Sequence, residues 1–127
     1  MATAPVFVGV PKTWQAALSA ANTNRDGTGT LVTVMSAGAS GSRIDKLRVV
    51  ASGTTTAGVI RYFLNDGTNK YLYRERLVSA ITPSATVAVF EDDVSLVDGL
   101  VLPTGWSLMA APHNAEAFKV FAQGGDI

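Results

Sequence analysis

The sequence contains no cysteine, and among its 127 residues there is a single histidine, His113. Without cysteine, neither a disulfide framework nor a thiolate metal site can form. A protein zinc site takes three or four nitrogen, sulfur or oxygen ligands, and one histidine supplies too few of the usual donors. The sequence therefore predicts that the protein binds no metal and no cofactor.

Charge and long apolar runs are also scarce. Charged residues make up 16% of the chain and the formal net charge is zero, whereas a typical domain is about 25% charged. Zero net charge disfavours binding to the phosphate backbone of nucleic acids. No apolar run approaches the roughly 20 residues of a membrane helix, and residues 1–5 lack the basic start and apolar core of a signal peptide. We therefore expect a soluble protein made in a cytoplasm, with neither nucleic acid nor membrane as a partner.

A surface with so little charge is poorly protected against association. The protein is either an ordinary β domain with a Thr/Ser surface or a subunit that buries much of its outside in an assembly, and the second interpretation is favoured. The charges are also unevenly spread. Residues 43–76 carry seven basic and three acidic side chains, and residues 77–127 carry one lysine and six acidic side chains. The two segments either pair within the fold, which is favoured, or form complementary patches on neighbouring subunits.

The most informative stretch that is present covers residues 58–78, with the sequence GVIRYFLNDGTNKYLYRERLV. Two apolar, aromatic-rich runs flank the Asp66-Gly67 pair, which is a strong β-hairpin signal. A two-residue type I′ turn at this pair places Tyr62 opposite Tyr71 and Ile60 opposite Tyr73. In that register one face of the hairpin is continuously aromatic and aliphatic, and the other is mixed and partly basic.

Short β-prone runs separated by turn residues recur along the whole chain, which is typical of an antiparallel sandwich, jelly roll or barrel. The sequence predicts an all-β fold, an antiparallel β-sandwich or jelly roll of about eight short strands. Residues 1–127 are expected to form a single domain with a short N-terminal arm (1–12) and a C-terminal tail (123–127). Besides the central hairpin, strands are expected over residues 5–10, 14–21, 31–35, 43–51, 86–91, 96–102, 106–111 and 117–122.

Candidate catalytic and metal-ligating groups are few. His113 could join a Ser-His-Asp triad, but no Gly-x-Ser-x-Gly elbow is present. The candidate nucleophiles Ser36, Ser40 and Ser42 lie in the Gly-rich stretch of residues 36–42. The segment from Asn22 to Gly27 resembles the start of a calcium-binding EF-hand loop, but its twelfth position is Thr33 and not a bidentate glutamate. A structural histidine and a turn-rich loop are the favoured interpretations. We expect no catalytic and no metal-binding residues.

Two further groups of residues have both a functional and a simpler interpretation. Glu91, Asp92 and Asp93 could supply paired carboxylates for glycoside hydrolysis, but their adjacency favours a solvated turn that ends the strand over residues 86–91. Five aromatic side chains could form a stacking platform for sugars or single-stranded nucleic acid, although most are expected in the core. These aromatic residues are Tyr62, Tyr71, Tyr73, Trp14 and Trp106.

Four segments resemble a group of small proteins encoded among the virion structural genes of tailed bacteriophages. These segments are NRDGTG at 24–29, SGTTTAGVIRYFLNDGTN at 52–69, LPTGWSL at 102–108 and HNAEAFKVFAQGGD at 113–126. The similarity runs over nearly the whole chain, and its motifs are structural. The resemblance implies a β-sandwich or jelly-roll virion component that is not an enzyme.

The function implied by this resemblance is that of a capsid decoration or cement protein, made in the host cytoplasm and located on the capsid surface of the virion. Its expected partners are the major capsid protein and further copies of itself, as a homo-oligomer and most plausibly a trimer. Residues 2–10 and 123–127 are the segments expected to reach a neighbouring subunit. The alternative is a tail-fibre or baseplate component, a sugar-binding β module used in host attachment.

Overall fold

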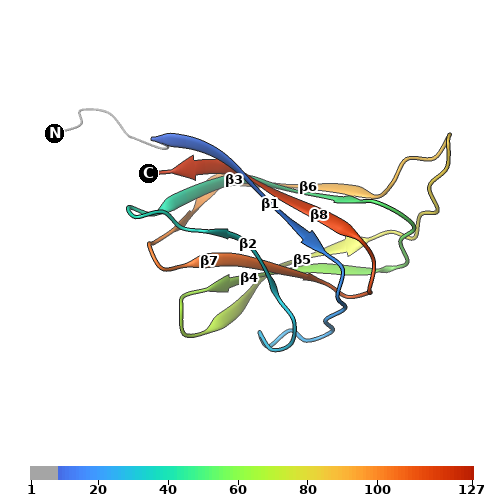
Figure 1. Cartoon of the computed structure of the whole chain (residues 1–127), viewed down its shortest axis with the longest axis horizontal. Coiled ribbons are helices and arrows are strands. Elements are labelled where there is room, and N and C mark those ends of the chain that lie inside the picture. The colour runs from blue at the N-terminus through green and yellow to red at the C-terminus, as the bar shows by residue number, and fades with distance from the viewer. Residues whose placement is uncertain (1–8) are drawn as a thin grey trace.

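In a computed structural model of the chain, residues 9–127 are described, apart from the side chains of residues 97 and 98. Within that part the chain forms two four-stranded antiparallel sheets packed as a sandwich (Figure 1). The first sheet has the order β1 (Val10–Leu18), β8 (Phe118–Asp126), β3 (Ser42–Ala51) and β6 (Glu91–Leu102). The second has the order β2 (Val32–Ser36), β7 (Ser107–Pro112), β4 (Gly58–Asn65) and β5 (Lys70–Val78).

This strand order is that of a jelly roll. The pairs β1–β8, β2–β7, β3–β6 and β4–β5 are all antiparallel. The chain is therefore one long antiparallel ribbon, with the β4–β5 turn at its tip, rolled so that its successive strand pairs alternate between the two sheets. The prediction of an all-β antiparallel sandwich is confirmed, and no helix in residues 9–127 is long and apolar enough to cross a membrane.

The core lies between the two inner sheet faces and follows the period-two alternation of side chains along each strand. Ile44, Leu47 and Val49 of β3 are fully buried, as are Ile60 and Tyr62 of β4. At one end of the core the rings of Phe90 and Phe118 meet edge to face, with centroids 6.5 Å apart. Aromatic pairs prefer this geometry because the positive ring edge faces the negative ring face.

The central hairpin forms, but its predicted register is wrong. Leu64 and not Tyr62 lies opposite Tyr71, and a β-bulge between Tyr62 and Phe63 leaves Tyr73 without a partner on β4. The turn spans residues 66–69, with the Asp66 N–H donating to the Asn69 carbonyl at 3.1 Å. Gly67 has φ of 95°, and no non-glycine residue in residues 9–127 has positive φ. A type I′ turn needs two positive φ angles, so this turn does not belong to that type.

Several predicted element bounds also change. Residues 86–90 are not a strand, and Glu91, Asp92 and Asp93 begin β6 where a turn was expected. These acidic residues are compatible with a strand because basic side chains of β3 and β5 pair with them. Residues 123–126, expected in a tail, belong to β8, and residues 10–12, expected in the arm, belong to β1. The rest of the expected arm, residues 1–8, lies outside the described residues.

Candidate functional site

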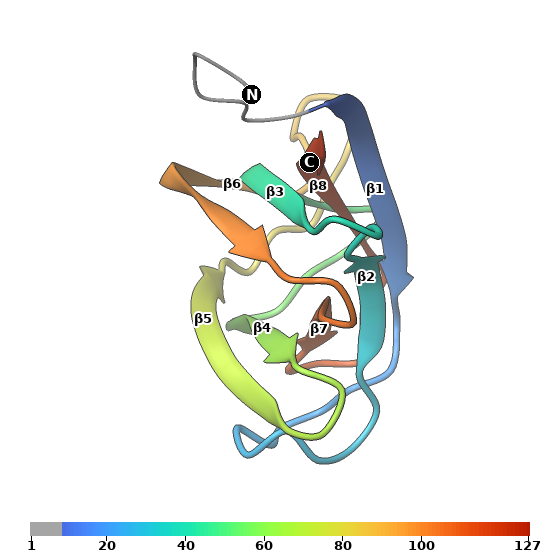
Figure 2. The same ribbon diagram turned by 90° about the vertical axis from the view of Figure 1, so that its left-hand side faces the viewer.

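The chain itself covers the outer face of the second sheet over β4 and β7, while β5 stays exposed. The β1–β2 loop, residues 19–31, passes beneath this sheet (Figure 2). Asn22 anchors the loop, because its backbone N–H donates to the Pro112 carbonyl at 2.9 Å and its side-chain amide donates to the Thr28 and Thr30 carbonyls at 3.0 Å each. Asn22 is 5% exposed. The loop explains why β7 is buried along its whole length and why both faces of β4 are buried.

The calcium-like segment uses its own oxygen atoms inside this loop. The Asp26 Oδ1 atom accepts hydrogen bonds from the Oγ1 and the backbone N–H of Thr28, and these bonds lower the pKa of Asp26. The Asn22 Oδ1 atom accepts from the Asn24 N–H at 3.0 Å. Among the described residues, no group of three or more histidine, aspartate or glutamate side chains is arranged to hold a metal ion. The structure supports the turn-rich interpretation of this segment.

Arg61 of β4 points into the space between the sheet and the loop, and it is 2% exposed. Its Nη1 donates to the Asn22 carbonyl at 3.0 Å, and its Nε donates to Glu75 Oε1 at 2.8 Å. Both Nη atoms lie 3.2 Å from His113 Nδ1. A guanidinium can only donate, so Nδ1 of His113 accepts and the neutral ring carries its proton on Nε2. His113 thus holds a buried arginine, as expected of a structural histidine.

Glu75 of β5 joins this cluster to the loop. Arg25 Nε lies 2.5 Å from the same Glu75 Oε1 that Arg61 contacts. The hydrogen bond from Arg25, followed by that from Arg61, lowers the pKa of Glu75, although partial burial opposes the shift. The arrangement fastens the β1–β2 loop to β4 and β5 through charge-assisted hydrogen bonds.

The other candidate residues are separated in space. Ser42 is the first residue of β3, and the other end of this strand pairs with Phe118. The Ser42 Oγ donates to Asp126 Oδ1 at 2.7 Å. It therefore has no access to His113. Glu91 pairs with Arg48 at 2.6 Å. Asp92 accepts two hydrogen bonds from Arg76 of the other sheet, at 2.8 and 2.9 Å. Each of the three adjacent carboxylates is thus engaged by basic side chains, since Asp93 lies near Lys46 and Arg48.

The five aromatic residues divide between the core and one strand. Tyr62 is fully buried, and Trp14 and Trp106 pack partly buried against the core. Tyr71 and Tyr73, 59% and 37% exposed, both lie on β5. The prediction that most of these side chains are core residues is confirmed, because three of the five lie in the core or pack against it.

The structure identifies β5 as the candidate functional site. The hairpin register expected from the sequence did not indicate that the side chains of this strand are exposed. Leu72 and Leu77 of β5 are 37% and 81% exposed. Thus four of the eight large hydrophobic side chains exposed in the described part of the chain lie on this strand. We call residues 70–78 with their exposed side chains the β5 edge. Such a concentration on one element marks an interaction surface more often than scattered single residues do.

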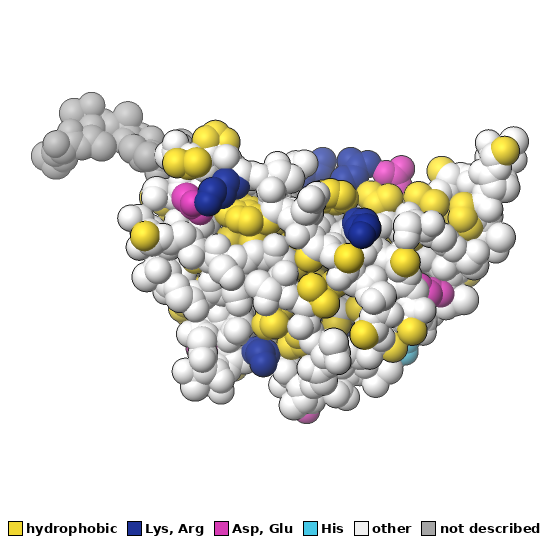
Figure 3. Space-filling model, in the orientation of Figure 1, with side chains coloured by type: hydrophobic (Ala, Val, Ile, Leu, Met, Phe, Trp, Pro, Cys, Tyr) yellow, Lys and Arg dark blue, Asp and Glu magenta, His cyan; other side chains and the backbone are white. Residues whose placement is uncertain are grey.

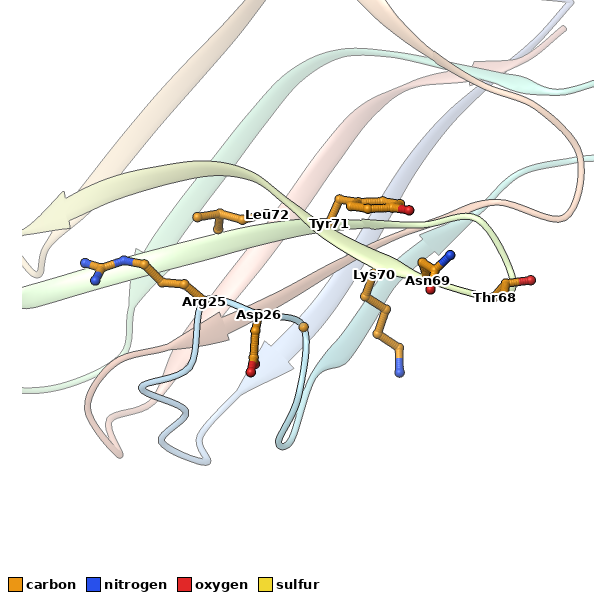
Figure 4. Close-up of a pocket in the computed structure, with 8 residues that line it drawn as sticks. Arg25, Asp26, Thr68, Asn69, Lys70, Tyr71 and Leu72 are labelled. Carbon is orange, nitrogen blue, oxygen red and sulfur yellow. The ribbon is translucent and has the colours of Figure 1, made fainter.

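An open pocket of about 390 Å³ lies at the start of the β5 edge. Arg25 and Asp26 line it from the β1–β2 loop, and the turn and the first residues of β5 line it from the other side (Figure 4). The side chains of Lys70 and Tyr71 extend to opposite sides of the strand. The lining is rich in polar groups, with the Tyr71 ring beside it.

Together the strand order and the β5 edge define a jelly-roll domain with an exposed apolar edge strand. No protein-family model matches the sequence, and no curated protein matches it. Two crystal structures of a pentameric capsid protein isolated from metagenomic phage sequences are similar to this chain, each with 18% identity and a TM-score of 0.38. The similarity covers 88% of this chain but only 57% and 59% of those chains, so this chain spans less than two thirds of their length.

Proposed function

We propose that the protein is a structural component of a tailed-phage virion, a decoration or cement protein that binds the assembled head and stabilises it. The observation that carries the proposal is a jelly-roll domain whose exposed apolar side chains are concentrated on one edge strand. Jelly rolls recur as viral capsid and lectin domains. An edge strand of this kind is suited to docking against another protein.

The segments that resemble phage virion proteins support the proposal through their place in the fold. Asn114 Nδ2 donates to Thr56 Oγ1 at 3.0 Å, and Glu116 Oε2 accepts from the N–H and Oγ1 of Thr56, both at 2.8 Å. Arg61 meets His113. Two of the segments that carry the resemblance, 52–69 and 113–126, therefore bind each other in this jelly roll.

The surface is consistent with close association. Figure 3 shows a few basic and acidic side chains scattered over a largely uncharged face. A cement protein works by burying surface across the seams between shell subunits, and many copies on one shell turn modest contacts into a large avidity. A low density of charge reduces the desolvation that such burial costs.

We further propose a homo-oligomer arranged around a local symmetry axis of the shell, with the trimer expected from the sequence as its state. Native mass spectrometry and sedimentation of the purified protein test this. A monomer at all accessible concentrations, or a ring of another size, contradicts the trimer without touching head binding.

Head binding is tested with particles that lack the protein. Purified protein added to such heads should co-sediment with them and appear on their outer surface in electron micrographs. Decorated heads should withstand heating or chelator better than bare heads. Binding at the tail tip with none on heads contradicts the proposal.

A second function, attachment to host glycans as part of a tail fibre or baseplate, is favoured by the open pocket. Tyr71 supplies a face for stacking against a sugar ring, and Thr68 and Asn69 of the same pocket supply hydrogen-bonding groups. Glycan-array binding that Tyr71→Ala abolishes, with no binding to heads, would establish this function.

A further inference from the structure

β5 is the outermost strand of its sheet. Figure 2 shows it at the margin, with β4 on its inner side, and in the described sheet it pairs with no other strand. An unpaired edge presents backbone N–H and C=O groups that can accept an added strand. Gly27 of the β1–β2 loop lies against the Lys70 carbonyl. The free length of the edge therefore begins after Lys70.

The charges on β5 show what kind of strand would fit. Arg76 is held by Asp92 of β6, and Glu75 is held by Arg25 and Arg61. Lys70 and Arg74 are exposed and take part in none of the ion pairs among the described side chains. The edge thus offers two uncompensated cations among four exposed apolar side chains.

A second copy of β5 cannot neutralise these cations. Its single carboxylate, Glu75, is already bonded to two arginines, and pairing two β5 strands would bring four uncompensated cations into one interface. A partner strand that carries carboxylates neutralises Lys70 and Arg74, and aliphatic residues between those carboxylates would cover Tyr71, Leu72, Tyr73 and Leu77. Charge complementarity therefore selects a different protein as the partner.

Two hollows beside the strand could receive side chains of such a partner. One is the pocket of about 390 Å³ next to Lys70 and Leu72, and the other, of about 430 Å³, is lined by Glu75, Arg76, Leu77 and Asp92. In strand addition, main-chain hydrogen bonds supply affinity and pockets for alternate side chains supply specificity. The bulge at Tyr73 interrupts the regular edge, which discourages indiscriminate pairing.

We propose that the β5 edge is the docking site for an extended acidic segment of another protein, which adds as a fifth strand to the β2-β7-β4-β5 sheet. That the partner is a subunit of the head shell rests on the proposed function. The strand-addition mode and the acidic chemistry rest on β5 itself.

A peptide experiment tests the mode without any particle. The probe is a capped peptide in which glutamate alternates with valine and threonine, and the comparison peptides carry lysine or serine in place of glutamate. In amide NMR spectra the acidic peptide at millimolar concentration should shift the amides of residues 71–78 and slow their hydrogen exchange. The serine peptide should bind about tenfold more weakly and the lysine peptide should not bind.

Charge reversal supplies the decisive variant. The double variant Lys70→Glu, Arg74→Glu should no longer bind the acidic peptide and should bind the lysine peptide, because the charge of the edge is reversed. Both substituted side chains are exposed and outside the ion pairs, so the fold should be unaffected. Lys119→Glu, an exposed cation on β8 in the other sheet, is the matched control and should behave as the unmodified protein. No shift at residues 71–78 with the acidic peptide, or shifts unaffected by the charge reversal, would overturn the inference.

The same variants separate this inference from the proposed function on heads. If the unmodified protein and Lys119→Glu bind heads and the double variant binds about tenfold more weakly, both stand. If all three bind equally, the β5 inference is wrong and the cement function remains. If none binds heads, the cement function fails and the peptide result alone decides the inference. A β5-mediated dimer that the charge reversal dissociates would overturn the choice of a different protein as the partner.

Discussion

At the scale of single residues, Arg61 is the charged side chain that the described fold buries. Taking an ion out of water costs several kcal/mol unless its hydrogen-bonding groups are satisfied. Here Glu75, the Asn22 carbonyl and His113 satisfy Arg61, and these partners come from three different parts of the chain. The cluster therefore ties the β1–β2 loop to the second sheet, and its loss should loosen that loop.

Replacing Arg61 by methionine leaves the buried Asn22 carbonyl and the partly buried His113 Nδ1 without their donor. We expect the free energy of unfolding, measured in urea, to fall by about 1–3 kcal/mol. Amides of residues 22–30 should also exchange faster. The control is Arg25→Met, which removes a 63% exposed side chain from the same carboxylate and should cost less than about 1 kcal/mol. Equal losses in the two variants would contradict the structural role of Arg61.

Gly124 of β8 marks a close approach of two backbones. A Cβ atom at this position would lie 1.9 Å from the Arg43 carbonyl oxygen, which belongs to the neighbouring strand β3. Gly124→Ala should therefore destabilise the protein by about 3 kcal/mol, because the two strands must separate to admit the methyl group.

Gly53 supplies the control for this substitution. A Cβ atom there would have no neighbour within 4 Å, and Gly53→Ala should change the free energy of unfolding by less than about 0.5 kcal/mol. Thermal melting of both variants checks the pair. A Gly124→Ala variant as stable as the unmodified protein would show that the β3–β8 register is wrong.

At the scale of elements, the β4–β5 turn combines a glycine at positive φ with side-chain support. Asn65 Oδ1 accepts from the Gly67 N–H at 2.9 Å, and Asp66 Oδ1 accepts from the N–H groups of Thr68 and Asn69 at 2.9 and 2.7 Å. The last two bonds lower the pKa of Asp66. The turn therefore depends on one glycine and on two polar side chains that precede it.

Gly67→Val should destabilise this hairpin, because a β-branched residue resists the positive φ of 95°. The expected cost is about 1–3 kcal/mol in the free energy of unfolding. Thr68→Val is the matched control, since Thr68 has no positive φ and already carries a β-branched side chain. A melting temperature unchanged by Gly67→Val would show that the turn conformation is wrong.

At the scale of the whole molecule, the uneven charge of the sequence pairs within the fold. Basic residues of β3 and β5 contact the acidic start of β6, through Arg48 with Glu91 and Arg76 with Asp92. The interpretation that the two charged segments pair internally is confirmed for these residues. The Arg76–Asp92 pair joins the two sheets along the margin where β5 and β6 lie, so it helps to close the sandwich there.

Lowered carboxylate pKa values predict a loss of stability in acid. The pKa of Glu75 is lowered chiefly by its hydrogen bond from Arg25, and that of Asp126 by its bonds from Lys12 and then Ser42. A carboxylate whose pKa is lower in the folded state contributes stability above its unfolded pKa and loses it as the pH falls through the folded pKa. Stability measured in urea should therefore be level from neutral pH down to about pH 5 and fall below about pH 4.

Glu75→Gln checks this pH dependence. The variant should be less stable at neutral pH and should show a smaller fall in acid, because the glutamine cannot be protonated. A fall in acid as large as that of the unmodified protein would mean that Glu75 does not contribute to the pH dependence.

The all-β class, the hairpin over residues 58–78 and the special role of Gly67 could be derived from the sequence, because turn chemistry and period-two alternation act between residues close together in the chain. The exposed edge could not be derived, because alternation defines two faces of β4 and β5 without saying which are covered. Both faces of β4 are buried because a loop from residues 19–31 crosses one of them and Arg61 bonds to it. β5 stays exposed because it is last in its sheet, and that position depends on strand pairing between distant segments.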